Sequence, residues 1–194
     1  MTKYQSLIVY GLLIIMTGLV LLIFEFSSSP TLRFPVAFGI LASAVFALVS
    51  AIKSKHLQVP FKYHGMHALG LAAFSVSLLL FATDISMLIY ITAFFMLFYG
   101  ITELIFGMQL LMLKASLSIP ILILRIIIGF IQGLGSIIIL QLSYFEESDA
   151  LLAAGIGLII AGISIILFKG ILKVLDSPNP EKLESILQYE IKNH

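Results

Sequence analysis

Six apolar stretches, each about as long as a bilayer-spanning helix, limit what this chain can fold into. They are divided by charges and prolines and cover residues 5–26, 34–52, 66–83, 85–106, 119–142 and 151–168. About 20 helical residues, each rising about 1.5 Å, cross the hydrocarbon core of a membrane. Hydrophobic residues make up 60% of the chain and charged residues 11%, which is more apolar than a water-soluble domain can bury. We therefore predict an all-α integral membrane protein with six transmembrane helices.

The first stretch follows a lysine, as a signal peptide would. It is too long for the apolar region of such a peptide, and the sequence after it offers no small-residue cleavage site. We expect it to remain in the chain as the first transmembrane helix.

Lysine residues are concentrated in every second loop of this arrangement. They occupy the N-terminus, the 53–65 loop, the 107–118 loop and the C-terminal tail, whereas the other loops carry only Arg33. Positive charge beside transmembrane helices marks the cytoplasmic side. We therefore expect both termini in the cytoplasm and the acidic segment 145–150 on the outside.

Composition and motifs exclude several classes of function. The net charge of +1 leaves no basic stripe for a nucleic acid, and the absence of cysteine excludes disulfides and thiolate chemistry. The sequence has no phosphate-binding loop after a strand, no zinc-protease motif and no serine-hydrolase motif. We expect no enzymatic activity and no cofactor. The expected partner is the lipid bilayer, with a homo-oligomer as a further possibility.

An internal repeat relates the three odd-numbered stretches. Positions recur at an interval of about 59 residues, with a small residue every seven, and a tight turn at Asp84 joins the third and fourth stretches as an antiparallel hairpin. We predict three hairpins in the same orientation, at about 4–55, 63–114 and 120–175. The matched positions are Tyr4, Gly11 and Gly18 in the first repeat, Tyr63, Gly70 and Ser77 in the second, and Leu122, Gly129 and Ser136 in the third.

The even-numbered stretches carry a shared motif that suggests a family. The segment "YGITELIFG" from Tyr99 is similar to "AGISIILFKG" from Ala161, with Gly100 on Gly162, whereas the first hairpin has "ILASAVFA" instead. Three such hairpins resemble the HdeD-type family of small bacterial acid-resistance membrane proteins, over nearly the whole chain to about Leu175. The resemblance implies a bacterial inner-membrane protein linked to survival of acid stress, and it implies no catalytic residues.

Small residues at helical spacing predict where the helices pack. In lipid, burying leucine against leucine gains little, so close backbone approach at small residues supplies much of the packing energy. We expect each of these small-residue ridges to face another helix. The candidates are Gly39, Ser43 and Ala47 in the second helix, Gly129 and Gly133 in the fifth, and Ala153, Gly157 and Ala161 in the sixth.

Two opposite charges lie inside the predicted spans. Glu103 and Arg125 are at comparable depths, about 10–16 Å from the cytoplasmic ends of consecutive antiparallel helices. A charge at this depth costs about 2.5–3.5 kcal/mol, which pairing relieves. One hypothesis is a structural ion pair, or an Arg125 that extends to the headgroups. The other is that Glu103 is a protonatable site, with Thr102 nearby and Gln132 one to two turns deeper.

His64 and His67 are three residues apart at the start of the third helix. A metal site or a pH sensor needs further ligands, and no carboxylate or cysteine accompanies them at ligand spacing. We interpret them as interfacial histidines and expect no metal site.

The last residues, 176–194, differ in character from the rest of the chain. Asn179 and Pro180 fit the start of a helix, and apolar residues from Leu183 to Ile191 share one stripe. We predict a short amphipathic helix on the cytoplasmic membrane face.

These observations favour a non-enzymatic membrane protein that acts through packing, lipid or partner contacts. The alternative is a small transporter or channel for protons or a small solute, with Glu103 in its path. Polar groups within the spans are few for a hydrated route.

Overall fold

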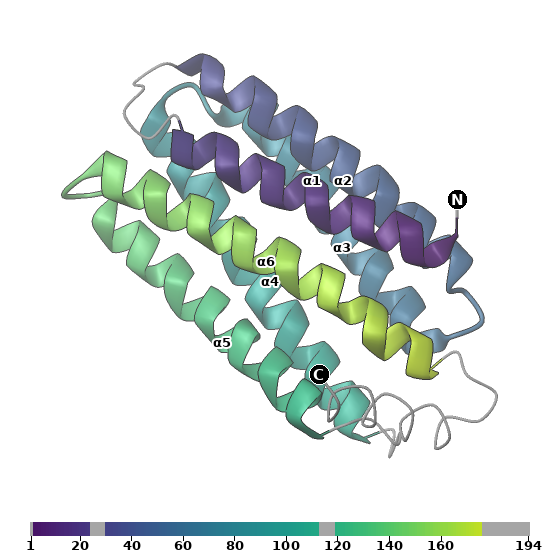
Figure 1. The fold of residues 1–194 in the computed structure, drawn as a ribbon. Helices are drawn as coiled ribbons and strands as arrows, with labels where there is room; N and C mark the ends of the chain where they lie inside the picture. Colours follow the sequence, from purple (N-terminus) through teal and green to yellow (C-terminus); the bar gives the residue numbers. More distant parts are fainter. Residues whose placement is uncertain (1, 24–29, 113–118, 176–194) are drawn as a thin grey trace.

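The computed structural model describes residues 2–23, 30–112 and 119–175, and these residues form a helical bundle without strands (Figure 1). All six long helices are long and apolar enough to cross a membrane, so the prediction of an all-α, six-helix membrane protein is confirmed. A short 3-10 helix, η1 (Pro30–Leu32), precedes the second long helix. The long helices are α1 (Lys3–Ile23), α2 (Arg33–Lys53), α3 (Gln58–Phe81), α4 (Ile85–Met112), α5 (Ile119–Leu142) and α6 (Glu147–Leu175).

Several helices extend beyond their predicted apolar spans. The fifth has the predicted bounds, but α3 begins at Gln58 and not at residue 66, so the predicted 53–65 loop is wrong. Pro60 fits the first turn of α3 because N–H groups there have no helical acceptor. Polar residues after Pro60 interrupt the apolar pattern without ending the helix. Likewise α4 continues to Met112 and α6 begins at Glu147 and ends at Leu175, whereas the predicted tail helix lies outside the described residues.

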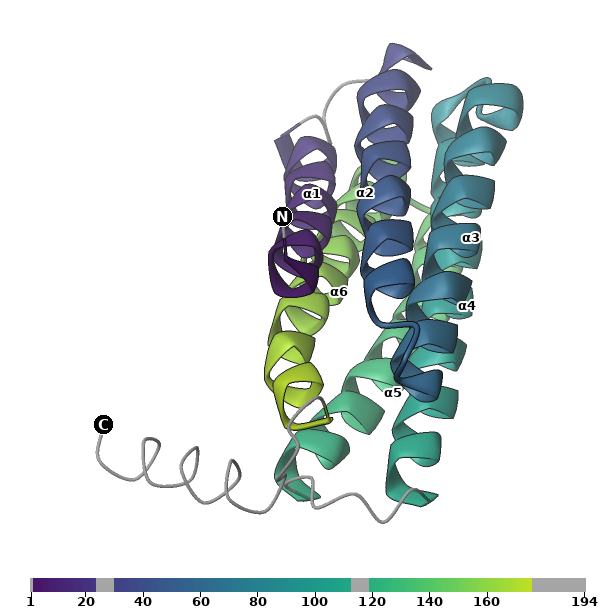
Figure 2. The same cartoon turned by 90° about the vertical axis from the view of Figure 1, so that its right-hand side faces the viewer.

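The six helices form a closed ring in the order of the sequence. Each helix packs against the next, α6 closes the ring against α1, and α4 also contacts α6 (Figures 1 and 2). The most extensive contacts are those of α1 with α6, α4 with α5, and α2 with α3. The main packing partner of each helix therefore belongs to a neighbouring predicted hairpin, and not to its own.

Glycine allows close backbone contact at two of these three interfaces, α1 with α6 and α4 with α5. A Cβ atom on Gly11 of α1 would lie 2.7 Å from the carbonyl oxygen of Gly162 in α6. Likewise a Cβ atom on Gly100 of α4 would lie 2.8 Å from the carbonyl oxygen of Gly129 in α5. Gly11 and Gly129 are equivalent positions in the predicted repeat, and so are Gly100 and Gly162. The same backbone contact therefore recurs between equivalent positions of different repeats.

The packing residues predicted in α2 also lie inside the bundle. A Cβ atom on Gly39 would overlap the hydroxyl of Thr17 in α1. The Ser43 hydroxyl donates to the Gly39 carbonyl at 2.8 Å, and Ala47 is buried. The other candidates are also buried or half-buried: Gly129, Gly133, Ala153, Gly157 and Ala161.

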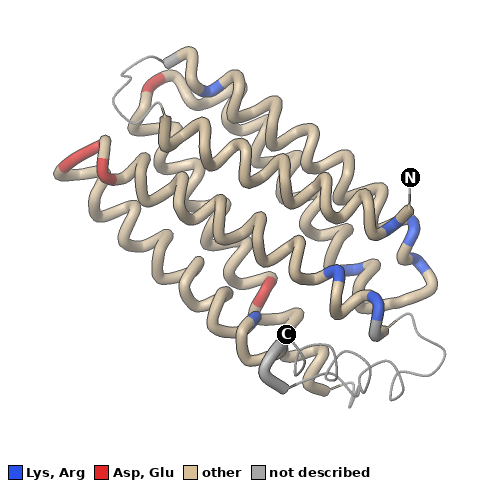
Figure 3. Tube along the Cα trace, in the orientation of Figure 1, with Lys and Arg blue, Asp and Glu red and all other residues tan. Residues whose placement is uncertain are grey.

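The two ends of the bundle differ in charge (Figure 3). The described lysines lie at the end that holds the N-terminus, the α2–α3 loop and the last turns of α6, and we call it the lysine-rich end. The opposite end, which we call the acidic end, holds the starts of α2, α4 and α6. It therefore carries Arg33 and the acidic residues Asp84, Glu146, Glu147 and Asp149.

Candidate functional site

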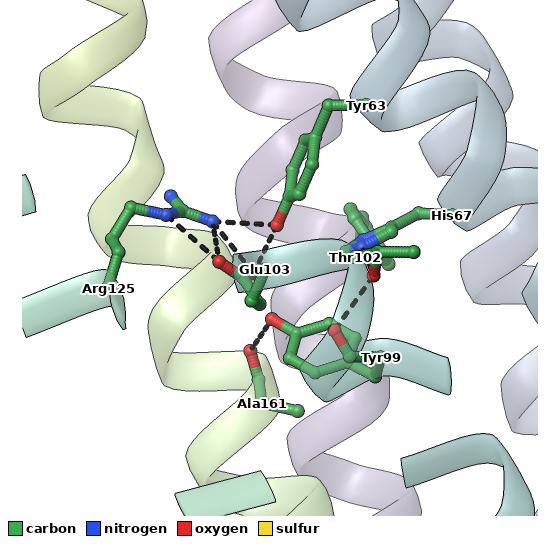
Figure 4. Close-up of polar contacts among 8 residues, drawn as sticks. Tyr63, His67, Tyr99, Thr102, Glu103, Arg125 and Ala161 are labelled. Atoms are coloured by element: carbon green, nitrogen blue, oxygen red, sulfur yellow. Dashed lines mark hydrogen bonds and ion pairs between the residues drawn. The ribbon is translucent and has the colours of Figure 1, made fainter. Parts of the chain in front are cut away.

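Glu103 of α4 and Arg125 of α5 form an ion pair inside the bundle (Figure 4). Arg125 Nε donates to Glu103 Oε2 at 3.0 Å, and Arg125 Nη2 donates to Oε1 at 2.7 Å and to Oε2 at 2.5 Å. The exposed fraction is 0% for Glu103 and 3% for Arg125. The two residues pair as their matched depths predicted. The alternative in which Arg125 extends to the headgroups is wrong, because its side chain is enclosed.

Backbone contact between α4 and α5 places this pair. Gly100 lies one turn before Glu103 on α4, and Gly129 lies one turn after Arg125 on α5. Because these glycines bring the two backbones together, the short gap between the helices is spanned by the two charged side chains. The ion pair therefore lies beside the glycine contact of this interface.

Tyr63 of α3 is the third member of the cluster. Its hydroxyl accepts from Arg125 Nη2 at 2.7 Å and donates to Glu103 Oε1. These directions follow because a guanidinium only donates and an ionised carboxylate only accepts. The guanidinium also lies 4.8–5.2 Å from the ring centroids of Tyr63, Phe106 and Phe168, within cation–π range. Arg125 Nη1 is buried and has no hydrogen-bond partner.

A second hydrogen-bond chain runs beside the ion pair and joins α1, α3 and α4. Thr102 donates its hydroxyl proton to the Tyr99 carbonyl at 2.8 Å, so its oxygen accepts from His67 Nε2 at 2.9 Å. His67 Nδ1 is then the acceptor for the Tyr10 hydroxyl at 2.8 Å. The geometry therefore assigns a neutral His67 with its proton on Nε2. The Tyr63 and His67 rings, 4.2 Å apart, connect this chain to the ion pair.

His64 and His67 are core residues, so their interpretation as interfacial histidines is wrong. Their exposed fractions are 0% and 2%. The reason is the early start of α3 at Gln58, which places both rings in the bundle interior. The His64 ring packs edge-on against Phe168, with its centroid 5.0 Å away, and neither ring nitrogen has a hydrogen-bond partner. Within the described ranges, no group of three or more histidine, aspartate or glutamate residues is arranged to hold a metal ion.

Gln132 lies outside the network around Glu103. Its Nε2 donates to the carbonyl oxygen of Gly157 in α6 at 2.8 Å, so it connects α5 to α6. A separate bond joins α4 to α6, where the Tyr99 hydroxyl donates to the Ala161 carbonyl at 3.2 Å. The hypothesis of a shared path through Glu103 and Gln132 therefore has no hydrogen bond to support it.

Three tyrosines of the site were not identified from the sequence as polar partners. Tyr63 lies one helical turn before His67, and Tyr99 lies one turn before Glu103, so each pair shares a face of its helix. That spacing was the available signal. It was not sufficient, because Tyr10 comes from a helix far away in the sequence and only the closure of α1 against the rest of the ring brings it to His67.

The cluster is enclosed by protein. Three lateral grooves lie elsewhere on the bundle, and none of the three includes Glu103 or Arg125. They lie between α3 and α4, between α5 and α6, and between α2 and α3, with volumes of about 620, 240 and 310 Å³ and mainly apolar walls. The polar groups of the cluster therefore contact one another and not the grooves. The ion pair joins α4 to α5, and hydroxyl and imidazole groups connect α1, α3 and α6 to this pair of helices.

Comparison of this chain with known protein families, with characterised proteins and with solved structures finds no match.

Proposed function

We propose that this chain is a non-enzymatic protein of the bacterial inner membrane, of the HdeD type, that contributes to survival of acid stress through lipid or partner contacts. In this proposal both termini lie in the cytoplasm, because the lysine-rich end holds the N-terminus and the last turns of α6. The contacts would be made by the lateral surface, where large apolar side chains are exposed along the helices.

One observation carries this proposal. The Glu103 carboxylate has no exposed surface, and both of its oxygens accept hydrogen bonds from neighbouring side chains. A carboxylate that carries protons or binds a solute needs a route to water. Enclosed and paired charges instead hold a bundle in one arrangement, which suits a protein that presents a fixed surface.

A survival assay tests the proposal. Cells that lack the gene should survive an acid challenge less well than the parent strain, and expression of the wild-type chain should restore survival. The combined Glu103→Gln and Arg125→Met variant keeps two groups of similar size at the core and removes both charges. At wild-type abundance it should also restore survival, because the proposed role needs the fold and not the carboxylate. Full abundance without protection would contradict the proposal.

The alternative function is transport of protons or a small solute through the site. The observation in its favour is the set of unpartnered donors and acceptors beside the ion pair, namely both ring nitrogens of His64 and Nη1 of Arg125. A path through them predicts proton uptake by liposomes that contain the protein, and its loss in Glu103→Gln. Our proposal predicts the same small leak in wild-type and variant liposomes, measured with an internal pH dye under an imposed pH gradient.

A further inference from the structure

The groove between α5 and α6 has an apolar wall with one polar side chain. It has a volume of about 240 Å³ and is lined by residues of both helices and by Met96 from α4. Ile131, Ile138 and Ile156 on its rim are each about half exposed on the lateral surface, so the groove opens towards lipid. The only side chain in its lining with a hydrogen-bonding N–H or oxygen is Gln132.

Gln132 is left with one unused acceptor. Its nitrogen must face the Gly157 carbonyl, which only accepts, and this fixes the orientation of the amide. The opposite atom, Oε1, is buried and has no hydrogen-bond partner, and the whole side chain has an exposed fraction of 1%. A buried acceptor without a partner is destabilising, so a donor that reaches Oε1 gains more than one that binds an exposed amide.

The flexible side chain of Met96 lies near this oxygen, at Gly157. The point that a Cβ atom on Gly157 would occupy lies 3.7 Å from Gln132 Oε1 and overlaps the terminal methyl of Met96. Glycine at position 157 therefore makes room for the thioether beside the amide. An unbranched methionine side chain changes rotamer at low cost, so it can move aside and expose Oε1 to the groove.

The chemistry of the groove selects one class of occupant. A buried water commonly makes two to four hydrogen bonds, and the groove offers Oε1 alone, since the Gly157 carbonyl already accepts from Gln132. An acyl chain of a lipid has no donor for Oε1. A charged molecule has no counter-charge in the lining. A cavity of about 150 Å³ holds benzene, so a groove of about 240 Å³ accommodates an aromatic ring with a small alkyl group.

We propose that the α5–α6 groove binds a small neutral molecule with an apolar body and one hydroxyl group, of the size of an alkylphenol, whose hydroxyl donates to Gln132 Oε1. Such a molecule dissolves in the bilayer and enters through the lateral opening. The proposal goes beyond the proposed function and does not depend on it.

Photolabelling with a matched pair of probes tests the proposal. The wild-type protein is placed in vesicles of phosphatidylethanolamine and phosphatidylglycerol with either a diazirine-bearing 4-alkylphenol or its methyl ether, which lacks the donor. Labelled residues are mapped by mass spectrometry, and labelling of the protein is divided by labelling of lipid to correct for partitioning. The phenol should label α5 and α6 about fivefold more than the ether, the ratio expected for one neutral hydrogen bond. Excess 4-propylphenol should compete with it.

Two variants should change this labelling in opposite directions. Gln132→Leu should reduce labelling by the phenol to the level of the ether, and Met96→Ala should increase it by exposing Oε1. Gln132→Met serves as a second acceptor-free variant if the leucine variant does not fold, as judged by its helix content and melting temperature. Equal labelling by phenol and ether, absence of competition, or undiminished phenol labelling in a folded acceptor-free variant would overturn the proposal.

Discussion

The ion pair between Glu103 and Arg125 allows a quantitative test of how the bundle is held together. Glu103→Gln would leave the guanidinium with a neutral amide in a site that is 3% exposed, and Arg125→Met would leave the carboxylate with only the Tyr63 hydroxyl. Removing one member of a buried pair costs about 3–5 kcal/mol, because the remaining charge is uncompensated. Each single variant should therefore lower the free energy of unfolding by about that amount.

The double variant should lose less unfolding free energy than the sum of the losses in the two single variants. With both charges removed, no unpaired ion remains in the core. The glutamine introduced in place of Glu103 keeps an acceptor for Tyr63, and the methionine introduced in place of Arg125 fills the space among the aromatic rings. Three hydrogen bonds and close contact between the charges indicate a coupling energy of about 2–3 kcal/mol, at the upper end of measured values for residues in contact.

Reversible unfolding in mixed micelles measures this coupling. The detergent mole fraction is raised stepwise, and helix content by circular dichroism gives the free energy of unfolding of the wild type, both single variants and the double variant. A matched control cycle uses Glu146→Gln and Lys173→Met, which are exposed at opposite ends of the bundle and should show no coupling. Additive losses at Glu103 and Arg125 would refute the reasoning and favour the hypothesis that Glu103 is a protonatable site.

Three further predictions follow from the packing, the second hydrogen-bond chain and the charge at the two ends. Gly162→Ala should lower the melting temperature, because its Cβ atom would lie 2.6 Å from a backbone oxygen of α1. Gly170→Ala is the control: the space around this position is open, so the melting temperature should stay unchanged or rise. Tyr10→Phe should lower the free energy of unfolding by about 1 kcal/mol, because it removes the hydrogen bond to His67. Nitrogen NMR of the wild type should find the proton of a neutral His67 on Nε2, and a proton on Nδ1 would contradict the assignment. A reporter fused after the C-terminus should be found in the cytoplasm and one inserted in the 143–146 turn outside; the same side for both would exclude this topology.

The number of helices and the central ion pair could be predicted from the sequence because both depend on the cost of polar groups in lipid. A long apolar run between charges has few structures available other than a spanning helix. Two opposite charges at matched depth on consecutive antiparallel helices are each costly alone and are stabilised by pairing, as Glu103 and Arg125 are.

The interior position of the histidines could not be predicted in the same way. His64, His67 and Lys62 reduce the local hydropathy, so the sequence pattern places the start of the apolar span at residue 66, although the helix begins at Gln58. A ring of helices can bury such residues without exposing them to lipid. The sequence pattern reports the average polarity of a segment, and it does not report which face of the helix is turned inwards.

The arrangement of the ring divides the interfaces into two kinds that support one another. Where glycine brings backbones together, as between α4 and α5, dispersion contacts along the helices contribute in addition to the Glu103–Arg125 ion pair. Where helices contact less, as between α3 and α4 or α5 and α6, side-chain hydrogen bonds join them: Tyr63 to Glu103, His67 to Thr102, and Gln132 to Gly157. These bonds need the glycine interfaces first, because a short polar side chain reaches its partner only when the backbones of the ring are already fixed. The hydrogen-bonded groups around Glu103 and His67 thus make the assembly of separate helix pairs cooperative. Without α1, Nδ1 of His67 would lack the Tyr10 hydroxyl, and without α5, the Glu103 carboxylate would lack the Arg125 guanidinium.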